Sequence, residues 1–475
     1  MLHRFTLLLI ILSLSLFAYA QKHEEKVIKS IEAKADAYQK AALNIWQYAE
    51  VGYQETQSVA QLQQLLEKEG FSIESGVAGI PTAFMASYGS GEPVIGIMGE
   101  YDALPGISQA ALPERQILVE DGAGHACGHH LFGVASAAAA IAIKDWLNDS
   151  KQAGTIRFYG TPAEEGGSGK VYMVRAGVFD DVDAVLHWHP SAANDASPGS
   201  TLANKSGKFR FYGESSHAAF APERGRSALD AVEAMNYMVN LMREHTTEST
   251  RIHYVITRGG EAPNVVPNYA EAYYYVRHGN VAEVKDLWSR LENAARGAAL
   301  GTDTRVEVEV TGGVYNILPN EALAKVVHKN LQKVGGVKYN AEEKAFAEKI
   351  AATLGRGKQP LNVAEQIMPM KMRVSKASSD VGDVSWAVPT VGLNTATWVP
   401  GTAAHSWQAV AAGGTSIGVK GMMVAAKTLA LTGIELMQNR EAVAAARKEF
   451  EQRRGENFQY EALVGDREPP LDYRK

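Results

Sequence analysis

The chain has 475 residues, of which 46% are apolar and 21% are charged, and its formal net charge is −6. This composition excludes a disordered or collagen-like chain, and the length predicts about three domains or one large domain with an insertion. The small excess of acidic residues provides no basic surface for nucleic acid. The single cysteine, Cys127, excludes an intramolecular disulfide.

The first twenty residues have the pattern of a secretory signal peptide. After a short basic start, residues 7–17 are almost all apolar, and Ala18-Tyr19-Ala20 fits a small-residue cleavage site. The apolar run is shorter than the roughly 20 residues that span a bilayer, and no later segment is expected to be long and apolar enough. We therefore expect cleavage before Gln21 and a secreted or periplasmic protein without a stable membrane anchor.

Helices and strands alternate after this leader. Apolar residues recur at three- and four-residue steps across residues 24–47, which predicts an amphipathic helix. The next predicted elements are a helix at 56–69, strands at 82–88 and 94–98, a helix at 131–147, a strand at 155–159, a helix at 170–176 and a strand at 184–188. Because the connections are too long for hairpins, this alternation predicts an α/β domain with helices flanking a mixed sheet.

The pattern changes at residue 206. From there to residue 316 the elements follow the order β-α-β-β-α-β, which is that of a ferredoxin-like unit. Its strands are expected at 208–212, 251–257, 270–277 and 305–311, and its helices at 227–243 and 281–300. We therefore predict an inserted α+β domain at 206–316 that interrupts a domain made of residues 21–205 and 317–475.

The second part of the interrupted domain resumes the helical pattern. Helices are expected at 321–333, 342–354 and 417–432, and the stretch at 375–414 between them is punctuated by Gly and Pro. The highly charged segment from residue 439 onward predicts a solvated helix followed by an irregular end.

The densest chemical signal is Gly-His-Ala-Cys-Gly-His-His at residues 124–130, directly before a predicted helix. It places the only thiol, Cys127, among three histidines, and Cys127 and His129 can converge in a turn. Thiolate and imidazole are ligands that suit Zn²⁺ and similar divalent ions. The segment therefore indicates a metal site; the alternative is a buried free cysteine beside incidental histidines.

Four other segments hold side chains that could complete such a site. Adjacent carboxylates at the end of a strand point in different directions, so one can bind a metal ion while its neighbour reaches a water. The candidates are Glu164 and Glu165, His187 and His189, His405, and Asp102, which could orient a ligand histidine. Taken alone, each of them could instead belong to a solvated turn or be a hydrogen-bonded core residue.

Six motifs, in this order, resemble a known superfamily. They are Glu-Tyr-Asp-Ala-Leu-Pro (100–105), Gly-His-Ala-Cys-Gly-His (124–129), Pro-Ala-Glu-Glu-Gly-Gly (162–167), Trp-His-Pro (188–190), Ser-His-Ala-Ala (216–219) and Pro-Gly-Thr-Ala-Ala-His-Ser (400–406). Together they resemble the di-metal amidohydrolases and peptidases that include aminoacylases, hippurate hydrolases and glutamate carboxypeptidases. The resemblance covers about residues 25–435 and is greatest to the branch of aminobenzoyl-glutamate utilization protein B.

The resemblance implies two bound divalent ions, Zn²⁺ or Mn²⁺, and an inserted domain that serves as a lid and forms a homodimer. By this resemblance the metal ligands are Cys127, His129, Glu165, His189 and His405. Glu164 matches the catalytic base, and His217 matches a lid histidine that helps hold the substrate carbonyl, often across the dimer. Asn264 matches a lid position near the substrate.

Two departures from the pattern affect the site. Other branches have His-x-Asp where this chain has Glu100-Tyr101-Asp102, and a bridging aspartate where Cys127 stands. Many relatives in the cysteine-bearing branch place the strand-end histidine so that His187 competes with His189 for the ligand role.

We therefore expect an exported metal-dependent amidohydrolase that cleaves the amide bond of small N-acyl or N-aroyl amino acids or dipeptides. Glu164 would take a proton from a metal-activated water, and His217 would help stabilise the oxyanion. Two alternatives stay open: a metal-free hydrolase with Cys127 as nucleophile, and an exported metal- or ligand-binding protein on a hydrolase fold without turnover.

Overall fold

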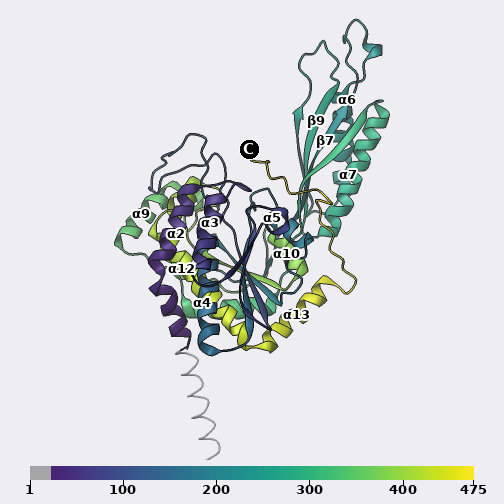
Figure 1. Ribbon diagram of the computed structural model, residues 1–475. Coiled ribbons are helices and arrows are strands. Elements are labelled where there is room, and N and C mark those ends of the chain that lie inside the picture. The colour runs from purple at the N-terminus through teal and green to yellow at the C-terminus, as the bar shows by residue number, and fades with distance from the viewer. Residues whose placement is uncertain (1–22) are drawn as a thin grey trace, which may run out of the picture.

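The computed structural model describes residues 23–475 (Figure 1). The expected signal peptide lies outside the described residues. The chain forms a body of helices around a central sheet, from which a second α+β unit projects.

The body is built on one six-stranded mixed sheet. Its strands, in spatial order, are β1 (Ser72–Ser75), β2 (Phe84–Ser90), β4 (Gly154–Gly160), β3 (Val94–Gly99), β5 (Ala184–Ser191) and β12 (Thr390–Ala396). The last four run parallel to one another, whereas β2 is antiparallel to both β1 and β4. The predicted α/β class with a mixed sheet is therefore confirmed.

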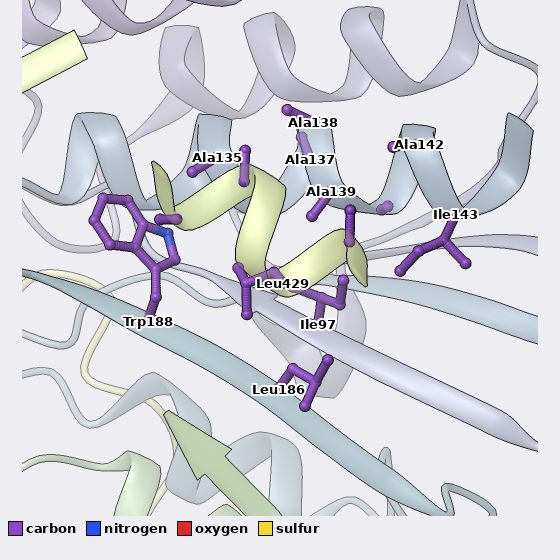
Figure 2. Close-up of a cluster of buried hydrophobic side chains, with 14 of the residues drawn as sticks. Ile97, Ala135, Ala137, Ala138, Ala139, Ala142, Ile143, Leu186, Trp188 and Leu429 are labelled. Carbon is purple, nitrogen blue, oxygen red and sulfur yellow. The ribbon is translucent and has the colours of Figure 1, made fainter. Parts of the chain in front are cut away.

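Two long helices, α4 (His129–Ser150) and α12 (Ser416–Gln438), form the centre of the core against this sheet. Figure 2 shows small side chains of α4, including Ala135 and Ala139, facing Leu429 of α12 and Ile97 of β3. Alanines permit this close approach because little side-chain volume separates the backbones. The apolar surface that both helices bury on several sides explains why neither has a polar face.

Both central helices are long and apolar enough to cross a membrane by length and composition, contrary to the expectation that no segment after the leader would be. In the most apolar stretch of each helix, 94% of α4 and 78% of α12 is buried inside the protein. Helices that are buried to this extent belong to the core of a folded protein.

The remaining body helices cover the sheet and carry loops to its edge. They are a helix at 23–33, α2 (Ala35–Tyr48), α3 (Thr56–Glu67), α5 (Gly169–Arg175), α8 (Glu321–Val334), α9 (Ala341–Thr353), α10 (Val381–Ala387), α11 (Trp407–Gly413) and α13 (Arg440–Arg454). The single helix predicted at 24–47 is interrupted at Lys34, which forms a turn. The Gly- and Pro-punctuated stretch at 375–414 contains α10, β12 and α11.

The projecting unit has its own sheet and its own core. Its elements are β7 (Ala203–Tyr212), α6 (Ala228–Met242), β8 (Arg251–Arg258), β9 (Tyr269–His278), α7 (Val281–Gly301) and β10 (Arg305–Val314). The strands form an antiparallel sheet in the order β10-β7-β9-β8, and α6 and α7 pack on it around Phe209, Tyr274 and Trp288. This is the predicted β-α-β-β-α-β unit, hereafter the lid (Figure 1).

A separate two-stranded sheet and a C-terminal tail complete the fold. The short strands β6 (Gly199–Ser200) and β11 (Arg373–Val374) pair in parallel beside the lid connection. After α13, residues 455–475 form a tail that passes the base of the lid and ends between the lid and the body (Figure 1).

Candidate metal centre

The candidate ligands meet at one edge of the central sheet. Glu100 and Asp102 follow the end of β3, Glu164 and Glu165 follow β4, and His189 lies near the end of β5. Because these three strands are parallel, their carboxyl ends lie side by side, where loops can bring polar side chains together.

The segment before α4 enters this edge beside the strand ends. Gly128 adopts φ +80°, and a Cβ at this position would lie 2.6 Å from the Cβ of Pro190. Glycine is therefore required between Cys127 and His129, and the turn it allows directs both side chains to the site. The His405 backbone N–H donates to the Ala126 carbonyl at 3.0 Å, which fixes the distant loop to the same segment.

These residues form two groups that share one sulfur atom. Cys127, His129 and His189 have ligand atoms within 4.8 Å of one another, and so have Cys127, Glu165 and His405. The Cys127 Sγ lies 3.3 Å from His189 Nε2. A third group, Glu100, His129 and Glu164, overlaps the first.

The buried polar atoms in these groups fit a bound cation. Among the described residues, His129 Nε2 and Glu165 Oε1 are buried and make no hydrogen bond. Yet they lie 3.0 Å from Glu100 Oε2 and 3.2 Å from His405 Nε2, respectively. In each pair, a nitrogen and an oxygen atom lie close together without a hydrogen bond between them. Ligand atoms around a common metal ion have this arrangement. The thiolate, imidazole and carboxylate set suits divalent transition metals.

Hydrogen bonds behind the ligands fix their orientation. The His129 Nδ1–H donates to Asp102 Oδ1 at 2.8 Å, and the Glu165 backbone N–H donates to Asp102 Oδ2 at 2.8 Å. The His189 Nδ1–H donates to the Pro190 carbonyl at 2.7 Å. Both rings therefore leave the lone pair of Nε2 free on the side of Cys127, which is the tautomer that a ligand histidine needs.

The two adjacent glutamates, Glu164 and Glu165, have different charged neighbours, which shift their pKa values in opposite directions. Burial, together with the charges of Glu100 and Glu165, raises the pKa of Glu164 well above its ordinary value. Burial also opposes ionisation of Glu165, but its contact with His405 and the charge of His129 lower the pKa of Glu165 overall. Neighbouring carboxyls with divergent pKa values can act as a proton acceptor and an anionic ligand, respectively.

A buried ion-pair network behind the site was missed by the sequence analysis. Lys170 Nζ, on α5, lies 2.7 Å from Glu100 Oε1 and 2.7 Å from Asp380 Oδ1, and all three side chains are essentially inaccessible. Burial opposes the charge of Lys170, but Asp380 and Glu100 raise the pKa of the lysine. No sequence signal could have found this pairing, because Asp380 lies 210 positions after Lys170.

The site opens into a cleft of about 620 Å³. Cys127, Glu164 and His405 line it, together with Asp195, Arg373 and Ser375 from other segments. His187 also lines the cleft but belongs to none of the three groups, whereas His189 belongs to the first. Burial and the charges of His189 and Lys170 lower the pKa of His187 to about 3.

The two lid residues lie together but outside this cleft. The Ala218 backbone N–H donates to the Asn264 carbonyl at 3.0 Å, and His217 Nδ1 accepts from the Phe220 backbone N–H at 3.1 Å. Neither His217 nor Asn264 lines the cleft of the same chain.

The fold, with its inserted lid domain, and the cluster of candidate metal ligands together are those of a hydrolase. Residues 96–406 match the model of the peptidase family M20/M25/M40. The chain belongs to this family, and it is therefore a metallopeptidase or amidohydrolase.

Two curated relatives extend the match to most of the chain. A p-aminobenzoyl-glutamate hydrolase subunit from Escherichia coli is 42% identical over 89% of this chain and 94% of its own length. The human Xaa-Arg dipeptidase is 30% identical over 86% of this chain and 87% of its own length.

Solved structures share the fold at low identity. A putative aminohydrolase from methicillin-resistant Staphylococcus aureus covers 87% of this chain with a TM-score of 0.67 and 17% identity, and 99% of its own chain is matched. The Bacillus subtilis YXEP protein, described as a dinuclear metal binding peptidase from the M20 family, covers 86% of this chain with a TM-score of 0.60 and 18% identity, and 99% of that chain is matched.

Proposed function

We propose that this protein is a di-metal amidohydrolase that cleaves the amide bond of small N-acyl or N-aroyl amino acids or dipeptides. The observation that carries the proposal is the pair of ligand groups sharing the Cys127 sulfur, with Glu164 beside them on the cleft wall. The names of two relatives, an aminobenzoyl-glutamate hydrolase and a dipeptidase, support this substrate class.

In the proposed site Cys127, His129 and His189 would hold one ion, and Cys127, Glu165 and His405 would hold the other. When bound, the ions lower the pKa of a water molecule and polarise the substrate carbonyl; Zn²⁺ and Mn²⁺ both suit the ligands. Asp102 keeps His129 in the tautomer that leaves Nε2 free and fixes the peptide of Glu165.

Glu164 is the proposed base and acid. With its raised pKa, Glu164 can take a proton from the attacking water as a carboxylate and then donate that proton to the leaving nitrogen as the C–N bond breaks. Proton delivery is needed because an amine anion is a poor leaving group. The pairing of a protonatable Glu164 with an ionised Glu165 supports this division of roles.

His217 and Asn264 are proposed to contact the substrate from a second copy of the chain. Their place on the lid, outside the lining of their own cleft, supports this arrangement. Sedimentation would detect the homodimer, and mixing two variants tests whether each chain contributes lid residues to the other's site. Mixing a His217→Ala chain with an inactive Glu164→Gln chain should restore part of the activity, whereas a monomeric enzyme would show none.

We also propose that the protein is exported after cleavage before Gln21. The apolar run at 7–17 and the small residues at 18–20 support this. The N-terminal sequence of the protein recovered from its native host tests the cleavage position.

Removal and return of metal test the function itself. Dialysis against a chelator should abolish hydrolysis of a panel containing aminobenzoyl-glutamate, N-acyl amino acids and dipeptides, and Zn²⁺ or Mn²⁺ should restore it. Activity that persists in the metal-free protein but is lost on thiol alkylation would favour Cys127 as a nucleophile. Full metal occupancy without turnover on any member of the panel would favour a binding protein.

A further inference from the structure

The tail that follows α13 lies beyond the residues matched by the family model, yet it is not a loose end. Leu463 is buried in the core of the lid and Val464 in that of the body. The Arg175 guanidinium of α5 donates to the carbonyls of Gly465 and Arg467 at 2.8 and 2.7 Å. From the sequence we expected only an irregular end here. The tail is irregular in backbone but held by specific hydrogen bonds.

The same tail is fastened to the base of the lid. Arg467 Nη1 donates to the carbonyls of Val310 and Thr311 in β10 at 2.9 and 2.8 Å, and its other terminal nitrogen lies 3.6 Å from Glu309 Oε1. The tail thus runs from a lid strand to α5, which directly follows the turn that carries the two glutamates.

The final residues reach that turn. The Tyr473 hydroxyl and Arg474 Nη2 donate to the Glu165 carbonyl at 3.0 and 2.9 Å. On the other side of the same residue, the Glu165 N–H donates to Asp102. The peptide groups on both sides of Glu165 are therefore held, one by the body and one by the tail.

The neighbouring peptides of the turn are held by the body. The Ala163 N–H donates to Glu55 Oε1 at 2.9 Å, and the Gly167 carbonyl accepts from the Tyr53 hydroxyl at 2.7 Å. Gly166 adopts φ +92°, a conformation in which steric restriction is weak for glycine. The orientation of the 165–166 peptide is therefore set by its hydrogen bonds more than by its own backbone.

The fit between the tail and the body is close. A Cβ on Gly52 would lie 2.3 Å from the Tyr473 hydroxyl oxygen, and the ring of Tyr473 packs edge-on against that of Tyr53 with centroids 5.6 Å apart. Glycine at position 52 leaves the space into which the tyrosine hydroxyl fits.

We propose that Tyr473 and Arg474 are positioning residues for the metal centre. By satisfying both lone pairs of the Glu165 carbonyl, one of them with a charged donor, they hold the 164–167 turn so that Glu165 faces Cys127 and His405. This inference rests on the proposed function, because it takes Glu165 to be a metal ligand. Neither residue lines the substrate cleft, so they act through the turn.

The test compares the full-length protein with the double variant Tyr473→Phe/Arg474→Gln, which removes the Tyr473 hydroxyl and the Arg474 guanidinium but keeps the aromatic ring and an unbranched polar side chain. We expect the dissociation constant for Zn²⁺, measured by competition with a chelating dye, to rise about tenfold or more. We expect kcat to fall by a similar factor while KM changes less than about twofold. In the cobalt-substituted protein, the visible absorption of the Co²⁺ site should shift.

Lys475→Ala is the matched control, since it removes an exposed side chain from the same turn of the tail. It should bind Zn²⁺ as the unaltered protein does. The variant Tyr473→Phe/Arg474→Lys, which keeps a cationic donor at position 474, should recover part of the affinity lost in the double variant. If the double variant does not fold, as judged by near-ultraviolet circular dichroism, the single variant Tyr473→Phe tests the same bond with the ring retained.

Unchanged Zn²⁺ affinity and kcat in the folded variants would overturn the positioning role. A KM increase at constant kcat would likewise overturn it, because the tail would then act on substrate binding. Failure of the proposed function is recognised separately: the unaltered protein would itself bind no Zn²⁺ tightly or would cleave no amide in the panel.

Discussion

At the scale of single residues, the site depends on opposing roles for chemically identical groups. Glu164 and Glu165 are adjacent, but one faces Glu100 and the other faces His405 and His129. Burial raises the pKa of both carboxyls, and their charged neighbours then move the two pKa values apart, upward for Glu164 and downward for Glu165.

Replacing Glu164 with glutamine tests this division. The amide cannot accept a proton, so we expect kcat to fall by about 10²- to 10⁴-fold, the usual contribution of a general acid–base group. Metal content, measured by mass spectrometry of the acid-digested protein, should stay the same because Glu165 remains. Retained turnover with retained metal would show that another group is the base.

The Lys170 network predicts a large effect on stability. Lys170→Met leaves Glu100 and Asp380 buried without their cation, so the free energy of unfolding should fall by about 3–5 kcal/mol in urea titrations. Lys427→Met provides the comparison, because it breaks the pair with Glu32 at a partly exposed position. That control should cost less than about 1 kcal/mol, and equal losses in the two variants would contradict the role given to burial.

At the scale of elements, some helices and strands pack so closely that a glycine is needed where they meet. Gly421 in α12 faces the end of β12: a Cβ there would lie 2.5 Å from the Ala396 carbonyl oxygen and 2.7 Å from Thr397 Cγ2. Since the nearest atom belongs to the backbone, a rotamer change cannot relieve the contact.

Gly421→Ala should therefore destabilise the protein by about 1–3 kcal/mol through overpacking. Gly297→Ala in α7 is its control, because the added methyl would meet only Met238 at 3.9 Å and an alanine favours the helix by roughly 0.5–1 kcal/mol. Thermal unfolding should show opposite shifts for the two variants. Shifts of the same sign would argue against contact with β12 as the cause.

At the scale of the whole molecule, buried carboxyls link stability to pH. Glu55, the first residue before α3, has one oxygen bonded to the Ala163 N–H and one buried oxygen without a hydrogen bond among the described residues. Burial and the charge of Asp102 raise the pKa of Glu55 from 4.5 to about 8.

The folded protein therefore keeps a proton on Glu55 that the unfolded chain releases above pH 4.5. The free energy of unfolding should fall as pH rises from about 4.5 to about 8, by at most about 5 kcal/mol from this group. Glu55→Gln should remove that part of the slope in urea titrations of the chelator-treated protein. Glu348→Gln, at an exposed position, should leave the slope unchanged; an unaltered slope in Glu55→Gln would contradict the assignment.

Local patterns predicted most elements of the fold. The 3.6-residue periodicity predicted the long helices, and the sequence pattern predicted the β-α-β-β-α-β order of the lid without any contact information. Strand β12 was missed because its seven residues, Thr390–Ala396, lie among Gly and Pro signals, and its identity depends on parallel pairing with β5.

The amino-acid order alone indicated the chemistry proposed for this protein: the types of candidate ligand, the tandem glutamates and the turn around Gly128, because these depend on neighbouring residues and on motifs that resemble a known family. Three-dimensional packing was needed to establish that His189, and not His187, joins Cys127, that Lys170 lies between Glu100 and Asp380, and that Tyr473 reaches Glu165. The physical reason is that contacts between residues hundreds of positions apart are set by how strands and helices pack, and local periodicity carries no information about that packing.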